Sequence, residues 1–220
     1  MDFQIKICGV RDHDGAKACV EAGADLVGFN FVPSSKRFIA PSEARVLVDV
    51  VGAERAVGVF RNQDQAHVLE VSRCVGLHWI QLHGDESPEV CASLRAQGFR
   101  IIKAISVDAD TAKPRGPLVP GDLGERNFRV APFEPVTDLR LFDAASPGSG
   151  KPFDHERLLA LSPTRPFLLA GGLTPENVGE AIEHVNPNGV DTASGVEREG
   201  RMDPARVAAF CRAARRARKR

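Results

Sequence analysis

Short apolar runs alternate along the chain with longer segments in which apolar residues recur at helical spacing. The runs that predict strands cover residues 4–8, 26–31, 56–60, 79–83, 100–107, 139–144, 167–170 and 190–193. Short, almost continuously apolar runs of this kind are typical of parallel strands that are buried on both faces. Helix starts are predicted where a capping residue or proline precedes an amphipathic segment, at Asp12, Pro41, Asp64, Ser87, Asp154, Thr174 and Asp203.

This alternation predicts a parallel sheet with helical crossovers, so the fold class is α/β. The length of 220 residues suits one (β/α)8 barrel that spans residues 1–220 as a single domain. An open doubly wound sheet is the competing fold, although no Gly-x-Gly-x-x-Gly follows the first strand. Residues 108–137 interrupt the pattern with many prolines and glycines, so we expect an irregular connection between the fifth and sixth strands.

Two small-residue turns follow the last two predicted strands. Gly171 and Gly172 come directly after residues 167–170, and Thr174 and Pro175 are suited to open the next helix. Ser194 and Gly195 come directly after residues 190–193. Barrels of this class often bind phosphate in the loops after strands 7 and 8, through free backbone N–H groups. A plain strand-to-helix connection that binds nothing is the alternative.

Candidate chemical groups lie at the predicted carboxyl ends of the strands, where (β/α)8 barrels have their active sites. They are Cys8, Arg37, Gln81, His83, Asp143, Ser149 and Asp191. Lys6 shares a strand face with Cys8, and a nearby cation would lower the pKa of a thiol from its usual ~8.5. The structural alternatives are a small buried cysteine, a core histidine, a capping carboxylate at Asp143 and a surface charge at Arg37. The chain has no cluster with metal-ligand spacing, so we expect no metal.

Composition narrows the functional class. The formal net charge is zero, which gives no general attraction to nucleic acid or to membranes, and no apolar run is long enough to span a bilayer. The basic segment 212–220 is best explained as a solvated helix end. Five scattered cysteines and the absence of a signal-peptide pattern indicate a cytoplasmic protein with reduced thiols.

Several motifs together resemble the phosphoribosylanthranilate isomerase family of tryptophan biosynthesis. In chain order they are Lys6–Gly9, Gly28–Phe31, Ser35–Arg37, Gln81–Gly84, Phe142–Asp143, Gly148–Asp154, Ala170–Val178 and Asp191–Glu197. The resemblance covers residues 4–204. The chain departs from the family pattern in the longer segment 108–137, in Lys36 where proline is usual, and in His155 where tryptophan is frequent.

The resemblance implies an Amadori rearrangement without a cofactor, in which N-(5-phosphoribosyl)anthranilate becomes 1-(2-carboxyphenylamino)-1-deoxyribulose 5-phosphate. It implies that Asp143 is the general acid and Cys8 the general base. Arg37, His83 and Asp191 would then bind the substrate. Its phosphate would lie against the backbone of three loops, at Gly148, Ser149 and Gly150, at Gly171 and Gly172, and at Ser194 and Gly195.

Asp143 must hold a proton near neutral pH in this scheme, and Cys8 must be a thiolate. The expected partner is a small phosphosugar, with no nucleic acid and no membrane, and the protein is expected to be a monomer or homodimer. Two other functions stay open: another phosphosugar isomerase or synthase on the same fold, and a non-catalytic barrel that binds phosphorylated ligands.

Overall fold

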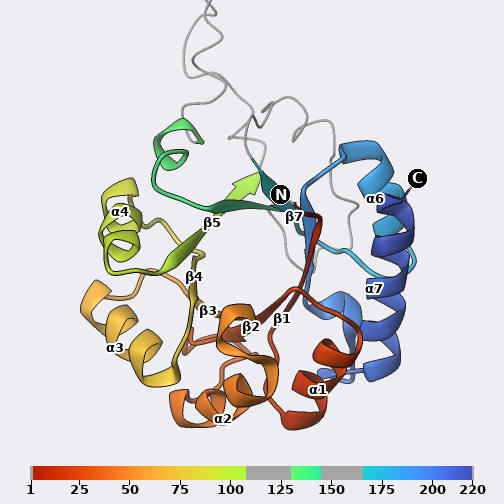
Figure 1. Cartoon of the computed structure of the whole chain (residues 1–220), viewed down its shortest axis with the longest axis horizontal. Helices are drawn as coiled ribbons and strands as arrows, with labels where there is room; N and C mark the ends of the chain where they lie inside the picture. The colour runs from red at the N-terminus through yellow and green to blue at the C-terminus, as the bar shows by residue number, and fades with distance from the viewer. Residues whose placement is uncertain (1, 108–129, 145–165, 220) are drawn as a thin grey trace, which may run out of the picture.

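The computed structural model describes residues 2–107, 130–144 and 166–219. Within these ranges, parallel strands in strict chain order close into a barrel (Figure 1). The strands are β1 (Gln4–Cys8), β2 (Leu26–Asn30), β3 (Ala56–Phe60), β4 (Trp79–Leu82), β5 (Arg100–Val107), β6 (Leu139–Ala144), β7 (Phe167–Leu169) and β8 (Gly189–Thr192). Pairing of β8 with β1 completes the barrel, so the prediction of a (β/α)8 fold is confirmed.

Helices surround the barrel and cover the outer face of its strands (Figure 1). They are α1 (His13–Glu21), α2 (Pro41–Val51), α3 (Gln65–Val75), α4 (Pro88–Ala96), α6 (Val178–Val185) and α7 (Pro204–Arg218). The predicted caps Asp12, Asp64 and Asp203 each accept a hydrogen bond from a backbone N–H in the first turn. The predicted start near Asp154 lies outside the described residues.

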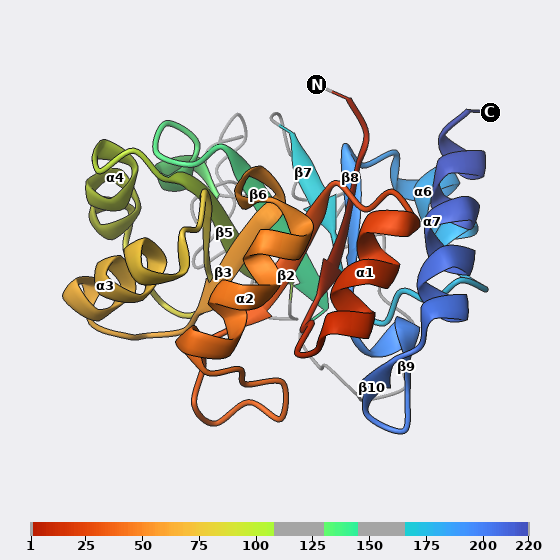
Figure 2. The ribbon, with the colours of Figure 1, turned by 60° about the horizontal axis from the view of Figure 1, so that its bottom comes forward.

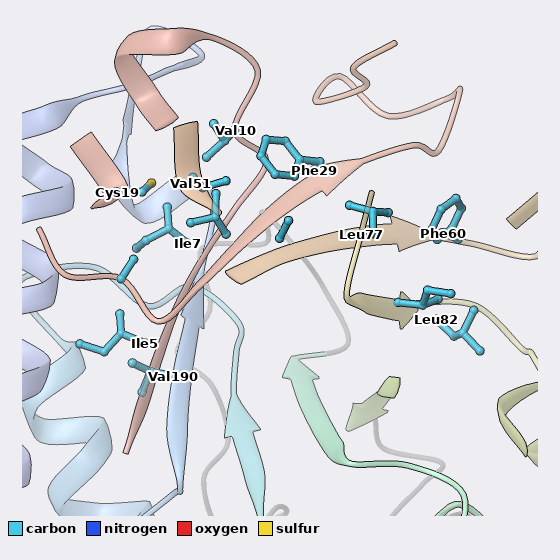
Figure 3. Packing of buried hydrophobic residues seen from close by; sticks show 14 of the residues in the cluster. Ile5, Ile7, Val10, Cys19, Phe29, Val51, Phe60, Leu77, Leu82 and Val190 are labelled. Atoms are coloured by element: carbon cyan, nitrogen blue, oxygen red, sulfur yellow. The ribbon is translucent and has the colours of Figure 1, made fainter. Parts of the chain in front are cut away.

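Each strand presents one face to the helices and the other to the barrel interior. Ile5, Ile7 and Val190 belong to the large core between strands and helices (Figure 3). A second cluster draws only on β2 to β7 and on Ala170, so it fills the interior. Side chains alternate along a strand, and therefore Lys6 and Cys8 of β1 face the interior.

Two local predictions differ from the structure. The helix predicted to begin at Thr174 begins at Val178, because the Asn177 side chain accepts the Thr174 N–H and donates to the Gly172 carbonyl, which fixes a turn first. The predicted strands 26–31, 79–83, 167–170 and 190–193 each end one residue earlier, and the last also begins one residue earlier. In the expected irregular segment 108–137, the described residues 131–133 form a 3₁₀ helix, and 108–129 lie outside the described residues.

An antiparallel hairpin of β9 (Glu197–Arg198) and β10 (Arg201–Met202) follows the barrel, and the sequence analysis missed it. Its turn residues Glu199 and Gly200 both have positive φ, at 51° and 75°. In Figure 2 the hairpin lies at the lower end of the barrel, and the strand β1 runs toward that end. The hairpin is therefore at the same end of the barrel as the carboxyl ends of the strands.

Candidate active site

Polar side chains collect inside the barrel at the carboxyl ends of four strands or just beyond them. Cys8 ends β1, His83 follows β4, Asp143 lies near the end of β6 and Asp191 lies in β8. By alternation, each shares its face with an interior residue: Lys6, Trp79, Leu141 or Gly189. The structure thus brings Cys8, His83, Asp143 and Asp191 to the same mouth of the barrel, as predicted.

Lys6 and Asp191 form a buried ion pair across the seam between β1 and β8. The two residues are register partners, and Lys6 Nζ lies 2.8 Å from Asp191 Oδ1. Lys6 is fully buried, and Asp191 is 8% exposed. Burial by itself would lower the pKa of Lys6, but the Asp191 carboxylate outweighs it and raises that pKa above its ordinary value. Lys6 is therefore an ammonium whose charge is largely matched by Asp191.

Cys8 is partly buried beside this pair, and Gly28 on the neighbouring strand leaves room for it. A Cβ at position 28 would lie 2.8 Å from Cys8 Sγ. Burial raises the pKa of the Cys8 thiol, and Lys6 lowers it only in part because the Asp191 charge opposes Lys6. Lys6 therefore lowers the pKa of Cys8, as the sequence suggested, but burial outweighs this effect and the net shift is upward.

His83 connects Asp143 to the interior of the barrel. Its Nε2 lies 3.5 Å from Asp143 Oδ2, and its Nδ1 lies 2.8 Å from Gln81 Nε2. The Gln81 amide thus holds the Nδ1 side of the ring, and the Nε2 side faces the Asp143 carboxylate. Both residues also affect the pKa of Asp191: Asp143 raises it and His83 lowers it. Asp191 thus lies within electrostatic reach of both the Lys6–Cys8 side and the His83–Asp143 side of the mouth.

Arg37 reaches the mouth from the loop after β2 and is held there by Glu197. Its Nε donates to Glu197 Oε1 at 2.6 Å, and its Nη2 donates to Glu197 Oε2 at 2.8 Å. Burial would raise the pKa of Glu197, but the hydrogen bonds and charge of Arg37 hold it below its ordinary value. The Arg37 side chain passes directly over Gly9, where a Cβ would lie 2.4 Å from Arg37 Cδ. Sequence reasoning named Arg37 as a site residue but did not find Glu197.

The loops after β7 and β8 interlock at the mouth. Gly171 and Gly172 have φ angles of 97° and 66°, which favour glycine. Ser194 and Gly195 begin a 3₁₀ turn, and a Cβ at Gly195 would lie 1.9 Å from the Leu173 carbonyl oxygen. Thr192 Oγ1 donates to the same oxygen at 2.7 Å. The two loops predicted to bind phosphate are therefore neighbours, while Gly148, Ser149 and Gly150 lie outside the described residues.

The part of the chain that the structure describes holds neither a metal-binding cluster nor a membrane-spanning helix. Among the residues with described positions, no group of histidine, cysteine, aspartate or glutamate side chains is placed to hold a metal ion. Across residues 2–107, 130–144 and 166–219, no helix combines the length and apolarity that a membrane span requires.

Comparison with known proteins gives one consistent family. The family model for N-(5'-phosphoribosyl)anthranilate (PRA) isomerase matches residues 5–213. The N-(5'-phosphoribosyl)anthranilate isomerase of Desulforudis audaxviator is 40% identical, over 97% of this chain and 98% of that protein.

Solved structures agree with this result. The crystal structure of phosphoribosyl anthranilate isomerase from Thermotoga maritima has a TM-score of 0.82 and 35% identity, and covers 97% of this chain and 98% of its own. A phosphoribosyl anthranilate isomerase in complex with reduced 1-(o-carboxyphenylamino)-1-deoxyribulose 5-phosphate has a TM-score of 0.80 and 33% identity, with the same coverage. A third structure, also with a TM-score of 0.80 and 33% identity over 97% of this chain and 98% of its own, concerns monomers generated from the dimeric T. maritima enzyme. On the barrel, its site and these matches, the chain belongs to the N-(5'-phosphoribosyl)anthranilate isomerase family.

Proposed function

We propose that Cys8 and Asp143 are the general base and general acid of the family's reaction. The chain is an isomerase of tryptophan biosynthesis, and it converts N-(5-phosphoribosyl)anthranilate to 1-(2-carboxyphenylamino)-1-deoxyribulose 5-phosphate. The rearrangement consists of two proton transfers on one sugar. An acid protonates the furanose ring oxygen, so that the C1–O bond breaks and a protonated Schiff base forms. A base then removes the C2 proton, and the resulting enolamine tautomerises to the ketone.

Asp143 acts on the ring oxygen in this proposal. Its side chain is 20% exposed and lies 3.5 Å from His83 Nε2. The His83 ring lies beside the carboxyl group and is available to a substrate hydroxyl. Asp191 accepts a hydrogen bond from Lys6 with Oδ1, and its Oδ2 can bind a sugar hydroxyl. The Asp143 charge also acts on Asp191, so the two carboxyl groups serve one site.

Cys8 acts on the C2 proton. Its pKa is raised by burial in the free protein, so the thiolate is the minor form at neutral pH. Ring opening changes this balance, because the protonated Schiff base carries a positive charge on the bond next to C2. A cation close to a buried thiol favours the thiolate. The base would thus be activated after the acid has acted, in the order that the reaction requires.

Binding is assigned to the two ends of the substrate. Arg37 binds the carboxylate of the anthranilate ring, for which the planar guanidinium is suited. The backbone N–H groups of residues 171–172 and 194–195 bind the phosphate, with help from Gly148, Ser149 and Gly150. The interlocked loops after β7 and β8 support this assignment, since one dianion can contact both.

The observation that carries the proposal is the shared interior face of Cys8 and Asp143 at the carboxyl ends of β1 and β6. The test follows the loss of substrate fluorescence with purified protein. Cys8→Ser and Asp143→Asn should each lower kcat by roughly 10²–10⁴, the usual contribution of general acid–base catalysis. Cys74→Ser, which changes an exposed thiol, is the matched control and should keep full activity. Near-normal kcat in either site variant would remove that residue from its role.

Assembly and location complete the proposal. The dimeric relative from T. maritima supports a homodimer as well as a monomer for this chain, and sedimentation at micromolar concentration separates the two. A cytoplasmic location is proposed because the base must remain a reduced thiol.

A further inference from the structure

We propose that Glu197 is a positioning residue that sets the selectivity of the site for a carboxylate-bearing substrate. It holds one edge of the Arg37 guanidinium, so that the adjacent edge is presented to the aromatic carboxylate of the substrate. The inference rests on the assignment of Arg37 to that carboxylate. Glu197 itself is not proposed to contact the substrate, and it acts only through Arg37.

The donor geometry of Arg37 carries the first step. A guanidinium has five N–H donors in one plane: one on Nε and two on each terminal nitrogen. Glu197 accepts one hydrogen bond from Nε at 2.6 Å and one from Nη2 at 2.8 Å. No described residue accepts a hydrogen bond from Nη1, and one Nη2 hydrogen also remains. One Nη1 hydrogen and the remaining Nη2 hydrogen form the Nη1–Nη2 edge, which can bind a second carboxylate in the same bidentate manner.

Burial makes this orientation persistent. The Glu197 side chain is 8% exposed and that of Arg37 is 19% exposed. A bidentate pair that is shielded from water fixes the plane of the guanidinium, whereas an exposed arginine samples many rotamers. Gly9, directly after Cys8, leaves space for the arginine stem, because a Cβ there would lie 2.4 Å from Arg37 Cδ. The oriented edge is thus held close to the proposed base.

Local charge keeps the pair attractive to an anion. Arg37 and Glu197 together carry no net charge, so the pair alone would draw a carboxylate only weakly. Lys36 and Arg11 are also close enough for their positive charges to lower the pKa of Glu197, and they add positive charge around the pair. Arg11 Nη1 donates to the Lys36 carbonyl at 3.0 Å and Nη2 donates to the Gly200 carbonyl at 2.5 Å. Arg11 therefore ties the loop that carries Arg37 to the β9–β10 hairpin that begins with Glu197.

The opposite role for Glu197 would be competition, in which it occupies Arg37 and must be displaced by the substrate. The two roles predict opposite effects on KM. Removal of a positioning group raises KM, and removal of a competitor lowers it. Because Glu197 uses the Nε side, and no described residue occupies the end of the guanidinium, the geometry points to positioning.

The experiment compares two substrates, the natural one and N-(5-phosphoribosyl)aniline, which lacks the carboxylate. The wild-type preference is the ratio of their kcat/KM values. Glu197→Gln should lower that preference by about tenfold to a hundredfold, the order expected when a binding group is misplaced by about 1 Å. The loss should appear in KM for the natural substrate, with kcat/KM for the aniline unchanged. Glu197→Asp, which keeps the charge but withdraws the carboxylate, should give a smaller loss of the same kind.

Arg37→Ala distinguishes the proposed role of Arg37, which binds the carboxylate, from the proposed role of Glu197, which orients Arg37. If Arg37→Ala abolishes the preference and Glu197→Gln leaves it intact, the role of Glu197 is wrong and that of Arg37 stands. If Arg37→Ala leaves the preference intact, the Arg37 assignment is wrong and the Glu197 proposal falls with it. An equal loss on both substrates in Glu197→Gln, or a lower KM, also overturns the proposal. Glu21→Gln, on a surface pair with Lys17, is the matched control and should change neither substrate.

Discussion

Lys6 and Asp191 are register partners on the first and last strands of the barrel, and their side chains form an ion pair of 2.8 Å inside it. Lys6 has no exposed surface, so its ammonium depends on this carboxylate for compensation. Burial raises the pKa of Cys8, and the pair limits how far Lys6 can offset this, because the Asp191 charge opposes that of Lys6. One interaction thus affects both the stability of the barrel and its proposed base.

Lys6→Met should lower the free energy of unfolding by about 3–5 kcal/mol, because it leaves the Asp191 carboxylate buried without its partner. Urea unfolding measures the change. The double variant Lys6→Met/Asp191→Asn removes both charges and should recover a large part of the loss. Strictly additive losses in the two single variants and the double variant would show that the residues are not coupled.

Alkylation of Cys8 by iodoacetamide should accelerate as pH rises beyond the usual thiol value of ~8.5, because burial raises the pKa of Cys8. Peptide mass mapping between pH 6 and pH 10 follows each cysteine separately. Activity should change with pH in the same direction. The proposed base Cys8 acts as a thiolate, so kcat/KM should increase as pH rises from neutral toward the pKa of this thiol. Fast modification of Cys8 at pH 6 would contradict the raised pKa.

Gly28→Ala should lower kcat by at least tenfold while the barrel still folds. The added Cβ would lie 2.8 Å from Cys8 Sγ and 3.2 Å from Cys8 Cα, so the thiol must move from its place. Gly179→Ala in α6 is the matched control, since its Cβ would meet only Ala217 Cβ at 3.9 Å. The control should keep kcat and gain up to about 1 kcal/mol in stability from helix propensity. Normal turnover in Gly28→Ala would separate Cys8 from the rate-limiting chemistry.

Stability should decrease at alkaline pH because buried thiols away from the site, namely Cys19, Cys91 and Cys211, resist ionisation. Burial raises the pKa of Cys91 and of Cys211 from 9.0 to about 11. An unfolded chain ionises these thiols first, so the folded state loses stability as pH rises from 9 toward 11, by at most about 1.4 kcal/mol per pH unit for each thiol. Urea unfolding in the presence of a reductant measures this slope.

The double variant Cys91→Ala/Cys211→Ala provides the comparison for that slope. The loss of packing from the two substitutions is the same at every pH, so only the slope reports ionisation. The variant should be less stable overall but should lose stability less steeply between pH 9 and pH 11. An unchanged slope would assign the alkaline loss to other groups, such as the lysines in ion pairs.

The barrel and the position of its mouth could be predicted from sequence because both follow from local patterns. Alternation along Gln4–Cys8 was enough to place Lys6 and Cys8 on one face, and the glycine turn after Phe167–Leu169 predicted which end of the barrel binds a ligand. The start of α6 was missed because Asn177 makes a local turn with its side chain, which competes with the cap expected at Thr174.

Pairings between distant residues could not be predicted in the same way. Arg37 and Glu197 are separated by 160 positions, and their contact depends on a hairpin whose turn uses Glu199, a residue that rarely adopts positive φ. Burial raises the pKa of Cys8, and how far Lys6 can offset that rise depends on the register of β1 against β8, which sets Asp191 beside Lys6. A sequence shows which charges exist, but only the closed barrel determines which of them neutralise one another.

The seam between β1 and β8 also has a consequence for biosynthesis of the chain. Lys6 leaves the ribosome early, and its ion-pair partner Asp191 follows 185 residues later. Until that strand has been made, the ammonium would have to enter the interior alone, at a cost of several kcal/mol. The nascent chain therefore cannot give its first strand a stable final place until β8 has been made, and Cys8 acquires its final environment only after that step.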